Sequence, residues 1–276
     1  MVHTSGAAAV VAVLALASSM AFAKAVPSPV PTRDQRPGTC HLAADPYELA
    51  AIASDTAPPV PCTQPHQTET MWVATVTGPL AQPSRRPNSE LLDHFLAPLC
   101  SDYQKVRAYV GASPEDSTWG IQSWVRFPTA AEWAAGDRTM LCQGSTTHYG
   151  PDGPTIDRSI GGIMATRASA MFRPCRARGA PVSCDQPHDS EATSPDVVFP
   201  AGPWPGAAMA AQMAAAACAP VTDAYLAAPL RDRPELVSQP DGPRQSDWAA
   251  GKRYADCWIA NANGLLTTGT VRGGLR

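Results

Sequence analysis

The chain contains the same pair of short motifs twice. C-x-Q-P-H-x-x-E occurs at residues 62–69 and again at 184–191, and W-A-A-G-x-R-x-x-x-C follows at 133–142 and again at 248–257. The motifs keep their order at a spacing of about 120 residues, which indicates two copies of one domain. This repetition constrains the architecture and every cysteine, but it does not indicate a reaction.

The N-terminal residues predict a secretory signal. Residues 7–18 are an apolar run rich in Ala, Val and Leu, and Ala21-Phe22-Ala23 offers an A-x-A cleavage site. The run is shorter than the roughly 20 residues that span a bilayer, so a cleaved signal is favoured over an anchor. No cysteine follows the run, so a lipoprotein anchor is not supported. We expect a signal peptide at 1–23 and a Pro-rich spacer at 24–39.

Composition excludes two classes of partner. The net charge is −3 and the isoelectric point is about 6.0, so we expect no basic surface for nucleic acid or anionic lipid. The residues after the signal suit two domains of about 100–120 residues each. Domains of this size gain from covalent cross-links. No later segment approaches the roughly 18 apolar residues of a membrane span, so none is expected after signal cleavage.

The eight cysteines divide evenly between the copies. Matched sets of four in an exported protein are most simply disulfide-bonded. If each copy closes its own bonds in the same pattern, three pairings remain. We favour first with second and third with fourth, because the third cysteine lies on a predicted helix and the fourth on a predicted strand. The favoured bonds are Cys40–Cys62, Cys100–Cys142, Cys175–Cys184 and Cys218–Cys257.

Copy one is expected to alternate short strands with one main helix. Residues 70–76 predict a strand. Apolar residues at helical spacing predict a helix over 88–110, from an N-cap at Asn88 or Ser89 to Gly111, with Pro98 as a kink. The W-A-A-G-x-R segment is interpreted as a turn into a strand that ends at Cys142. A turn at 150–153 and a final strand reaching 159–162 complete the copy.

Copy two repeats this plan. A strand is predicted at 196–199, a helix from near Pro205, a turn at 261–264 and a closing strand that ends at 270–273. Met209 and Met213 are expected in the core of the helix. The fold class is therefore α+β, with a short antiparallel sheet, one main helix and two disulfides per copy. The expected boundaries are 40–163 for copy one, 164–174 for a connector and 175–276 for copy two.

Together these landmarks resemble the septum formation-related domain of exported and membrane-anchored proteins of high-GC bacteria. The resemblance is carried by both motifs, the helix cysteine and a closing G-[ST]-[IV]-x-G-like turn, present at residues 269–273. Copy one departs from this last element, with Arg158 where the first glycine would stand. The resemblance implies an association with septum formation, and it carries over no catalytic residue.

The histidine and glutamate of the first motif are the sharpest functional candidates. A His/Glu pair could transfer protons or bind a metal. The alternative is a structural imidazole that holds the turn after a disulfide and is oriented by the glutamate. The structural interpretation is favoured. The residues concerned are His66, Glu69, His188 and Glu191.

The second motif supplies Trp133 with Arg138 and Trp248 with Arg253. These pairs could form a carbohydrate-stacking surface, but a buried indole with a locally stacked arginine is favoured. Four further tryptophans lack an equivalent in the other copy, and any that are exposed are better candidates for a copy-specific binding face. These are Trp72, Trp119, Trp124 and Trp204.

Other chemistries find less support. Cys62 with His66, or Cys184 with His188, could form a thiol nucleophile or a zinc site. Disulfide formation is the simpler use of matched cysteines, and no C-x-x-C, P-loop, G-x-S-x-G or H-E-x-x-H is present. We therefore expect no metal, no cofactor and no catalytic residue.

The leading hypothesis is a non-catalytic, secreted or cell-envelope protein that binds an envelope protein or cell-wall component in connection with septum formation. The first alternative is a secreted hydrolase that acts on wall or peptide substrates through the His66/Glu69-type pair. The second is an extracytoplasmic metal binder that uses the same histidines. A deep pocket around His66 would favour catalysis, whereas burial of both histidines would favour binding.

Overall fold

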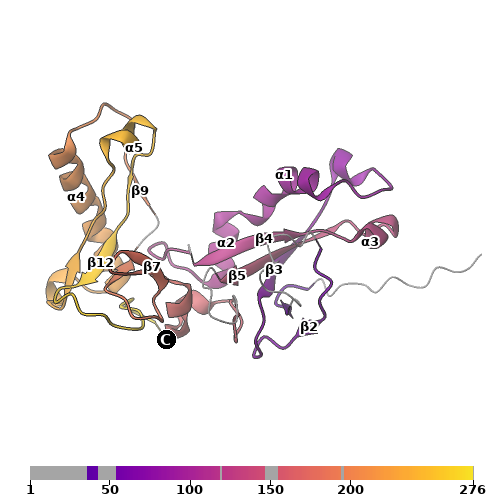
Figure 1. The fold of residues 1–276 in the computed structure, drawn as a ribbon, viewed down its shortest axis with the longest axis horizontal. Coiled ribbons are helices and arrows are strands. Elements are labelled where there is room, and N and C mark those ends of the chain that lie inside the picture. The colour runs from indigo at the N-terminus through magenta and orange to yellow at the C-terminus, as the bar shows by residue number, and fades with distance from the viewer. Residues whose placement is uncertain (1–35, 43–53, 119, 147–154, 194–195, 276) are drawn as a thin grey trace, which may run out of the picture. The chain divides into compact units, whose positions relative to one another are not determined.

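The computed structural model describes residues 36–42, 54–118, 120–146, 155–193 and 196–275 (Figure 1). The expected signal peptide, the spacer up to residue 35 and the expected turn at 150–153 lie outside the described residues. Residues 32–276 belong to one compact unit. Among the described residues, no helix combines the length and the apolar character that crossing a membrane requires.

Copy one forms a five-stranded antiparallel sheet in the order β2-β1-β3-β5-β4. Its centre is β3 against β5, where Thr75 pairs with Thr139 and Trp72 pairs with Cys142. The β-branched and apolar residues of these two strands suit a half-buried pleated surface. The strands are β1 (Cys40–His41), β2 (Pro59–Val60), β3 (Thr68–Thr75), β4 (Ile121–Arg126) and β5 (Thr139–Thr146).

Copy two builds the same sheet. Its order is β10-β12-β8-β6-β7, which read from the other edge places each strand as its counterpart lies in copy one. A two-stranded sheet of β9 and β11 accompanies it. The strands are β6 (Pro174–Ala177), β7 (Ala180–Ser183), β8 (Ser190–Ala192), β9 (Val197–Val198), β10 (Leu236–Ser238), β11 (Tyr254–Ala255) and β12 (Trp258–Asn261). Two antiparallel sheets with helices confirm the α+β class.

The helix expected over 88–110 is two helices, α1 (Ser89–Cys100) and α2 (Tyr103–Val110). Asn88 caps α1 by accepting the Leu91 N–H at 2.7 Å, as expected. The break follows Pro98 because Asp102 starts a new N-cap, with its carboxylate accepting the N–H groups of the next turn. Gly111 ends α2 with a φ of 70°.

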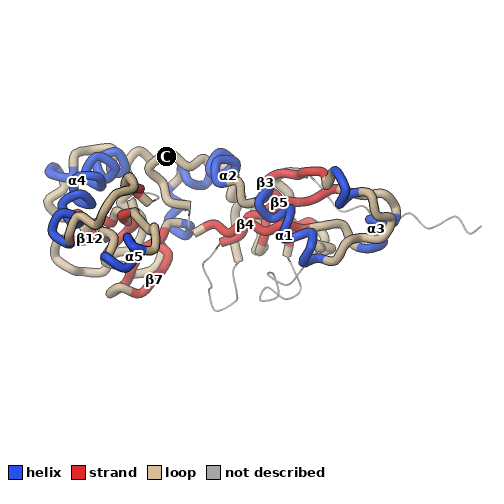
Figure 2. Tube along the Cα trace, turned by 90° about the horizontal axis from the view of Figure 1, so that it is seen from above, coloured by secondary structure: helices blue, strands red, loops and turns tan. Residues whose placement is uncertain are grey.

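Copy two has one long helix, α4 (Ala207–Leu226), which begins close to the expected position. The W-A-A-G-x-R segments begin in short helices rather than simple turns, namely α3 (Ala130–Ala134) and α5 (Gln245–Ala249). Figure 2 shows these helices among the strands and loops of each copy. Four 3₁₀ helices complete the described residues: η2 (Gly78–Ala81), η3 (Ile163–Ala165), η4 (Arg167–Phe172) and η5 (Leu230–Asp232).

All eight cysteines are paired as favoured from the sequence. The second bond of each copy ties its main helix to the end of the second motif, which lies within β5 in copy one and directly before β12 in copy two. The first bond joins β1 or β6 to the start of the first motif. The bonds are Cys40–Cys62, Cys100–Cys142, Cys175–Cys184 and Cys218–Cys257.

Four further local expectations are wrong. Residues 159–162 and 270–273 are closing turns rather than strands, because they are held by a side chain instead of a neighbouring strand. The strand expected to end at Cys142 continues to Thr146 as the partner of β4. Met209 is 49% exposed, whereas Met213 packs against the core of copy two.

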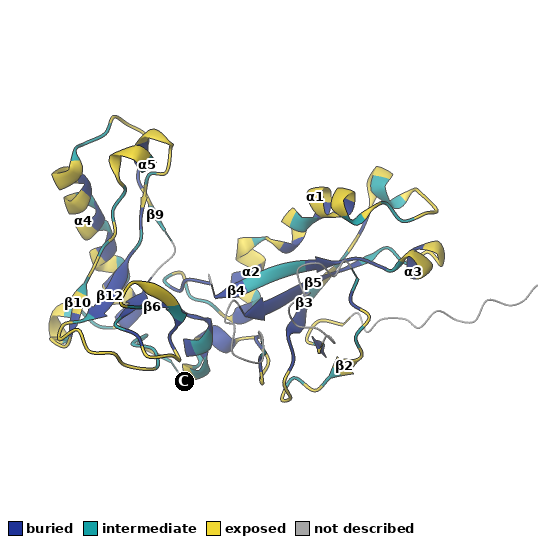
Figure 3. Cartoon of the chain, in the orientation of Figure 1, coloured by how far each residue is buried: buried dark blue, intermediate teal, exposed yellow. Residues whose placement is uncertain are grey.

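The expected connector, residues 164–174, is part of the core. Met164 and Phe172 are fully buried in one cluster with Met71 and Val110 of copy one. Figure 3 shows this burial continuing from β3 and β5, while the outer face of α1 is exposed. The main chain also fits closely here, because a Cβ at Gly120 would lie 1.9 Å from the Phe172 carbonyl oxygen.

Candidate functional site

The two motif histidines are buried in matching positions. His66 is 0% exposed and His188 is 2% exposed. Nδ1 of His66 lies 2.7 Å from the Gln64 carbonyl oxygen, and Nδ1 of His188 lies 2.8 Å from that of Gln186. The backbone of each histidine forms an isolated antiparallel bridge to the closing segment of its copy.

The electrostatics of His66 disfavour charge. Burial lowers the pKa of its imidazole below the ordinary value of 6.5, and this outweighs the opposing effects of the Gln64 carbonyl and the Glu69 carboxylate. Its Nε2 atom is buried without a hydrogen-bond partner among the described residues. A neutral imidazole without access to solvent is poorly placed for proton transfer to a substrate.

Glu69 is committed to the closing turn of copy one. Its carboxylate accepts hydrogen bonds from the Tyr109 hydroxyl at 2.5 Å, the Ser159 hydroxyl at 2.8 Å and the Ile160 N–H at 2.7 Å. Burial, followed by the hydrogen bond to Glu69, raises the pKa of Tyr109. Gly162 N–H donates to the Tyr109 carbonyl at 2.9 Å, so helix, motif and closing turn are joined.

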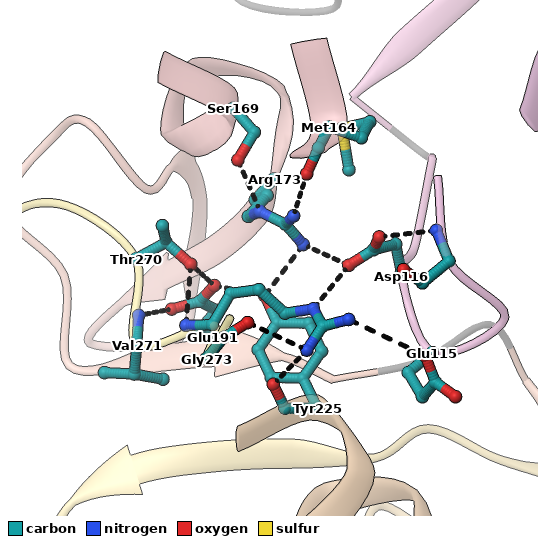
Figure 4. A network of polar contacts seen from close by, with 12 residues as sticks. Glu115, Asp116, Met164, Ser169, Arg173, Glu191, Tyr225, Thr270, Val271 and Gly273 are labelled. Atoms are coloured by element: carbon teal, nitrogen blue, oxygen red, sulfur yellow. Dashed lines mark hydrogen bonds and ion pairs between the residues drawn. The ribbon is translucent and has the colours of Figure 1, made fainter. Parts of the chain in front are cut away.

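Glu191 makes the same contacts in copy two. It accepts hydrogen bonds from the hydroxyls of Tyr225 and Thr270 and, at 2.8 Å, from the Val271 N–H (Figure 4). Gly273 N–H donates to the Tyr225 carbonyl at 3.0 Å. In both copies the expected His/Glu hydrogen bond is absent among the described residues. The glutamate instead fixes a turn about 80–90 residues further along the chain.

The tryptophan–arginine pairs also lie inside their copies. Trp133 is 0% exposed and donates to the Pro83 carbonyl at 2.8 Å, and Trp248 donates to the Gly202 carbonyl at 2.8 Å. The guanidinium groups of Arg138 and Arg253 lie 4.0 and 5.5 Å from the respective ring centroids. Neither indole is available to stack on a carbohydrate.

Among the described residues, the copy-specific tryptophans do not form an exposed face. Trp72, Trp124 and Trp204 are half-buried, and Trp119 lies outside the described residues. The Trp124 indole donates to the Ser145 hydroxyl at 2.7 Å, and Trp204 packs edge-on against Trp248 at 5.7 Å.

Two clusters have the composition of metal sites but not the available ligands. Cys175, Cys184, His188 and Glu191 have ligand atoms within 4.8 Å of one another, as do Cys40, Cys62 and Glu69. Each cysteine pair is a disulfide, which offers no thiolate. Each glutamate already accepts three hydrogen bonds within the protein. The residues present therefore do not fit a structural zinc ion or a thiol nucleophile.

A buried ionic network joins the two copies. Its charged residues, Asp116, Arg173 and Arg272, belong to neither of the repeated motifs. Asp116 accepts from Arg173 at 2.7 Å and from Arg272 at 3.0 Å, and the side chains of Asp116 and Arg173 are 2% and 1% exposed. Figure 4 shows Arg173 between Asp116 and Tyr225, whose hydroxyl lies 3.1 Å away. Arg173 also contacts Ser169 and the Met164 carbonyl.

A cavity of about 430 Å³ is lined by residues of both copies and of the segment between them. Copy one contributes Pro65 and residues 155–158, and copy two contributes Asp185. The connecting 3₁₀ helix η4 contributes Arg167, Ala168, Ala170 and Met171. Pro65 and Asp185 belong to the first-motif turns of their copies. The cavity volume lies in the range typical of small-ligand sites.

Fold and site together define a class: a tandem, disulfide-bonded α+β repeat protein whose shared polar residues secure its own turns. A family model described as septum formation matches residues 16–142 and again 168–274. The chain therefore belongs to the septum formation family, with two tandem copies. No curated protein matches it, and no solved structure does.

Proposed function

We propose that this protein acts in septum formation as an exported, non-catalytic binding protein of the cell envelope. The observation that carries the proposal is the use of the shared glutamates. Glu69 and Glu191 each hold a closing turn through three hydrogen bonds, so the strongest acid/base candidates are used for structure. Residues that recur in both copies therefore define a scaffold rather than an active site.

Export is supported by the cysteines. Four disulfides and no free cysteine among the described residues are typical of an oxidising compartment. The apolar run with its A-x-A site supports the same compartment. The partner we propose is an envelope protein or a cell-wall component, in keeping with the family.

Burial of both histidines favours binding over the two alternatives. A hydrolase that uses His66 would need that imidazole to face a substrate, and it is fully buried. A metal binder that uses His188 would need further open ligands, and its neighbouring sulfurs are oxidised.

The test separates a scaffold from an enzyme. In cells that lack the native protein, septation would be scored after expression of the double variant His66→Asn with His188→Asn. Asparagine can preserve the short polar contact made by each Nδ1 atom. We expect the double variant to restore septation as the native chain does, with crosslinking in the envelope capturing the same partner. Failure to restore, by a variant with native near-UV circular dichroism and export level, would refute the proposal.

A further inference from the structure

The cavity between the copies is a built surface rather than a gap between loops. Its wall includes Ile156, which is 0% exposed and belongs to the same core cluster as Phe172. Ala168 and Met171 line the cavity and pack against that cluster. The apolar part of the cavity is therefore preformed and made of small or flexible side chains.

Four ionisable side chains surround this apolar part, and they are not equivalent. Arg158 is paired with Asp157 at 2.7 Å, and Asp185 accepts from the Ser183 hydroxyl. Arg167 has no ion pair or side-chain hydrogen bond with any residue that the structure describes, and it is exposed at the start of η4. The cation available to a ligand is therefore Arg167.

The charges also limit the ligand. Two arginines and two aspartates give the lining no net charge. A phosphate or other polyanion would meet Asp157 and Asp185 without an excess of cations to compensate for the repulsion. One carboxylate can pair with Arg167 through a charge-assisted, bidentate contact.

Resting on the function proposed above, we propose that this cavity binds a short peptide that ends in a free carboxylate and carries small apolar side chains. The carboxylate pairs with Arg167, and the side chains contact Ala168 and Met171. Because Pro65 and Asp185 come from different copies, the complete cavity requires the tandem arrangement. This gives the duplication a role that one copy could not perform.

The experiment uses the exported full chain with its disulfides intact and two matched probes, N-acetyl-alanyl-alanine and its C-terminal amide. Binding would be followed by calorimetry and by NMR shifts. We expect the acid to bind about two- to fivefold more tightly than the amide, the range that an ion pair at an exposed arginine supplies. Inorganic phosphate should not displace the acid.

Arg167→Gln should remove the preference for the acid, with an unchanged melting temperature. The matched control is Arg231→Gln, which changes an arginine that is 83% exposed and outside the cavity. Equal binding of acid and amide, no binding of either probe, or retained preference in Arg167→Gln would each overturn the proposal.

The outcome is separable from that of the septation test. Septation restored by the histidine variant together with no probe binding would refute the cavity assignment alone. Probe binding that follows the expected pattern together with failed septation would refute the broader function and leave the cavity assignment in place.

Discussion

The two copies share a sheet topology and differ in how far each element extends. In copy one β3 is a single eight-residue strand, whereas the corresponding part of copy two is divided between β8 and β9. For the helices, copy one has the divided element: α1 and α2 are separate in copy one, whereas α4 of copy two is continuous. The features common to both are the disulfides, the glutamate and the tryptophan. These define the domain, and element length can vary around them.

The sharpest difference lies in the closing turns. Copy one has Gly161 at the position where copy two has Arg272. Arg272 reaches Asp116 of copy one and also contacts Glu115 at 3.7 Å. Copy two has therefore placed a cation at the position where it meets copy one. The two copies thus share contacts in their interiors and differ where they meet each other.

The largest effect is expected from the shared glutamates. Glu69→Ala and Glu191→Ala each remove a buried acceptor of three hydrogen bonds, so that one N–H and two hydroxyls lose this partner. Each should lower the free energy of unfolding by about 3–5 kcal/mol. Urea denaturation measures the change, and the exposed Glu90→Ala serves as control, with a loss of at most about 1 kcal/mol. A small loss at one glutamate would show that the copies do not depend on this contact equally.

The disulfides rank next, and their expected contributions differ with the length of the loop that each one closes. Cys100–Cys142 closes a separation of 42 residues and Cys175–Cys184 one of only 9. In the chain-entropy model these bonds contribute about 3.9 and about 2.6 kcal/mol. Replacing each pair by serines and measuring denaturation should reproduce the order. The reverse order would mean that native contacts outweigh loop entropy.

Much of the shared scaffold could be predicted from the sequence, because it consists of local signals and of motifs that occur twice. Repetition reduced the cysteine pairings to three, and the predicted helix and strand favoured the one observed. The outer ends of the copy-one helices followed from Asn88 and Gly111. The break at Asp102 was missed because its capping role competes with an otherwise continuous apolar pattern. The contacts of Asp116 could not be found, since 57 and 156 residues separate it from Arg173 and Arg272.

The contact between copies can be tested by Asp116→Asn. Asparagine keeps an oxygen near Arg173 but removes the negative charge that pairs with a guanidinium 1% exposed. The expected loss is about 1.5–3 kcal/mol, the contribution of a hydrogen bond to a charged group. Glu115→Gln is the matched control and should cost about 0–1 kcal/mol, because its carboxylate is 27% exposed. Equal losses would contradict the ranking of buried over exposed contacts.

A smaller effect concerns pH. Since burial lowers the pKa of His66, the unfolded chain takes up this proton first as the pH falls below about 6.5. The imidazole therefore lowers the free energy of unfolding at acidic pH. The full loss is about 1.4 kcal/mol for each unit by which the pKa in the folded protein lies below that in the unfolded chain. His66→Asn should flatten the stability profile between pH 7 and pH 5. An unchanged difference between these two pH values would show that His66 is charged in the fold.

The smallest effect separates the helix ends of the two copies. Gly111 ends α2 at a φ of 70°, and Ala227 occupies the corresponding left-handed conformation after α4 at a φ of 53°. A left-handed alanine costs roughly 1–2 kcal/mol relative to the right-handed form, and the greater freedom of glycine in the unfolded chain offsets part of that cost. Ala227→Gly should therefore stabilise copy two by about 0.5–1 kcal/mol in thermal unfolding. Gly111→Ala should destabilise copy one by more than this, because its Cβ would also lie 3.0 Å from Gly162 Cα. If Ala227→Gly lowered stability, the alanine side chain would have to contribute packing that exceeds its backbone strain.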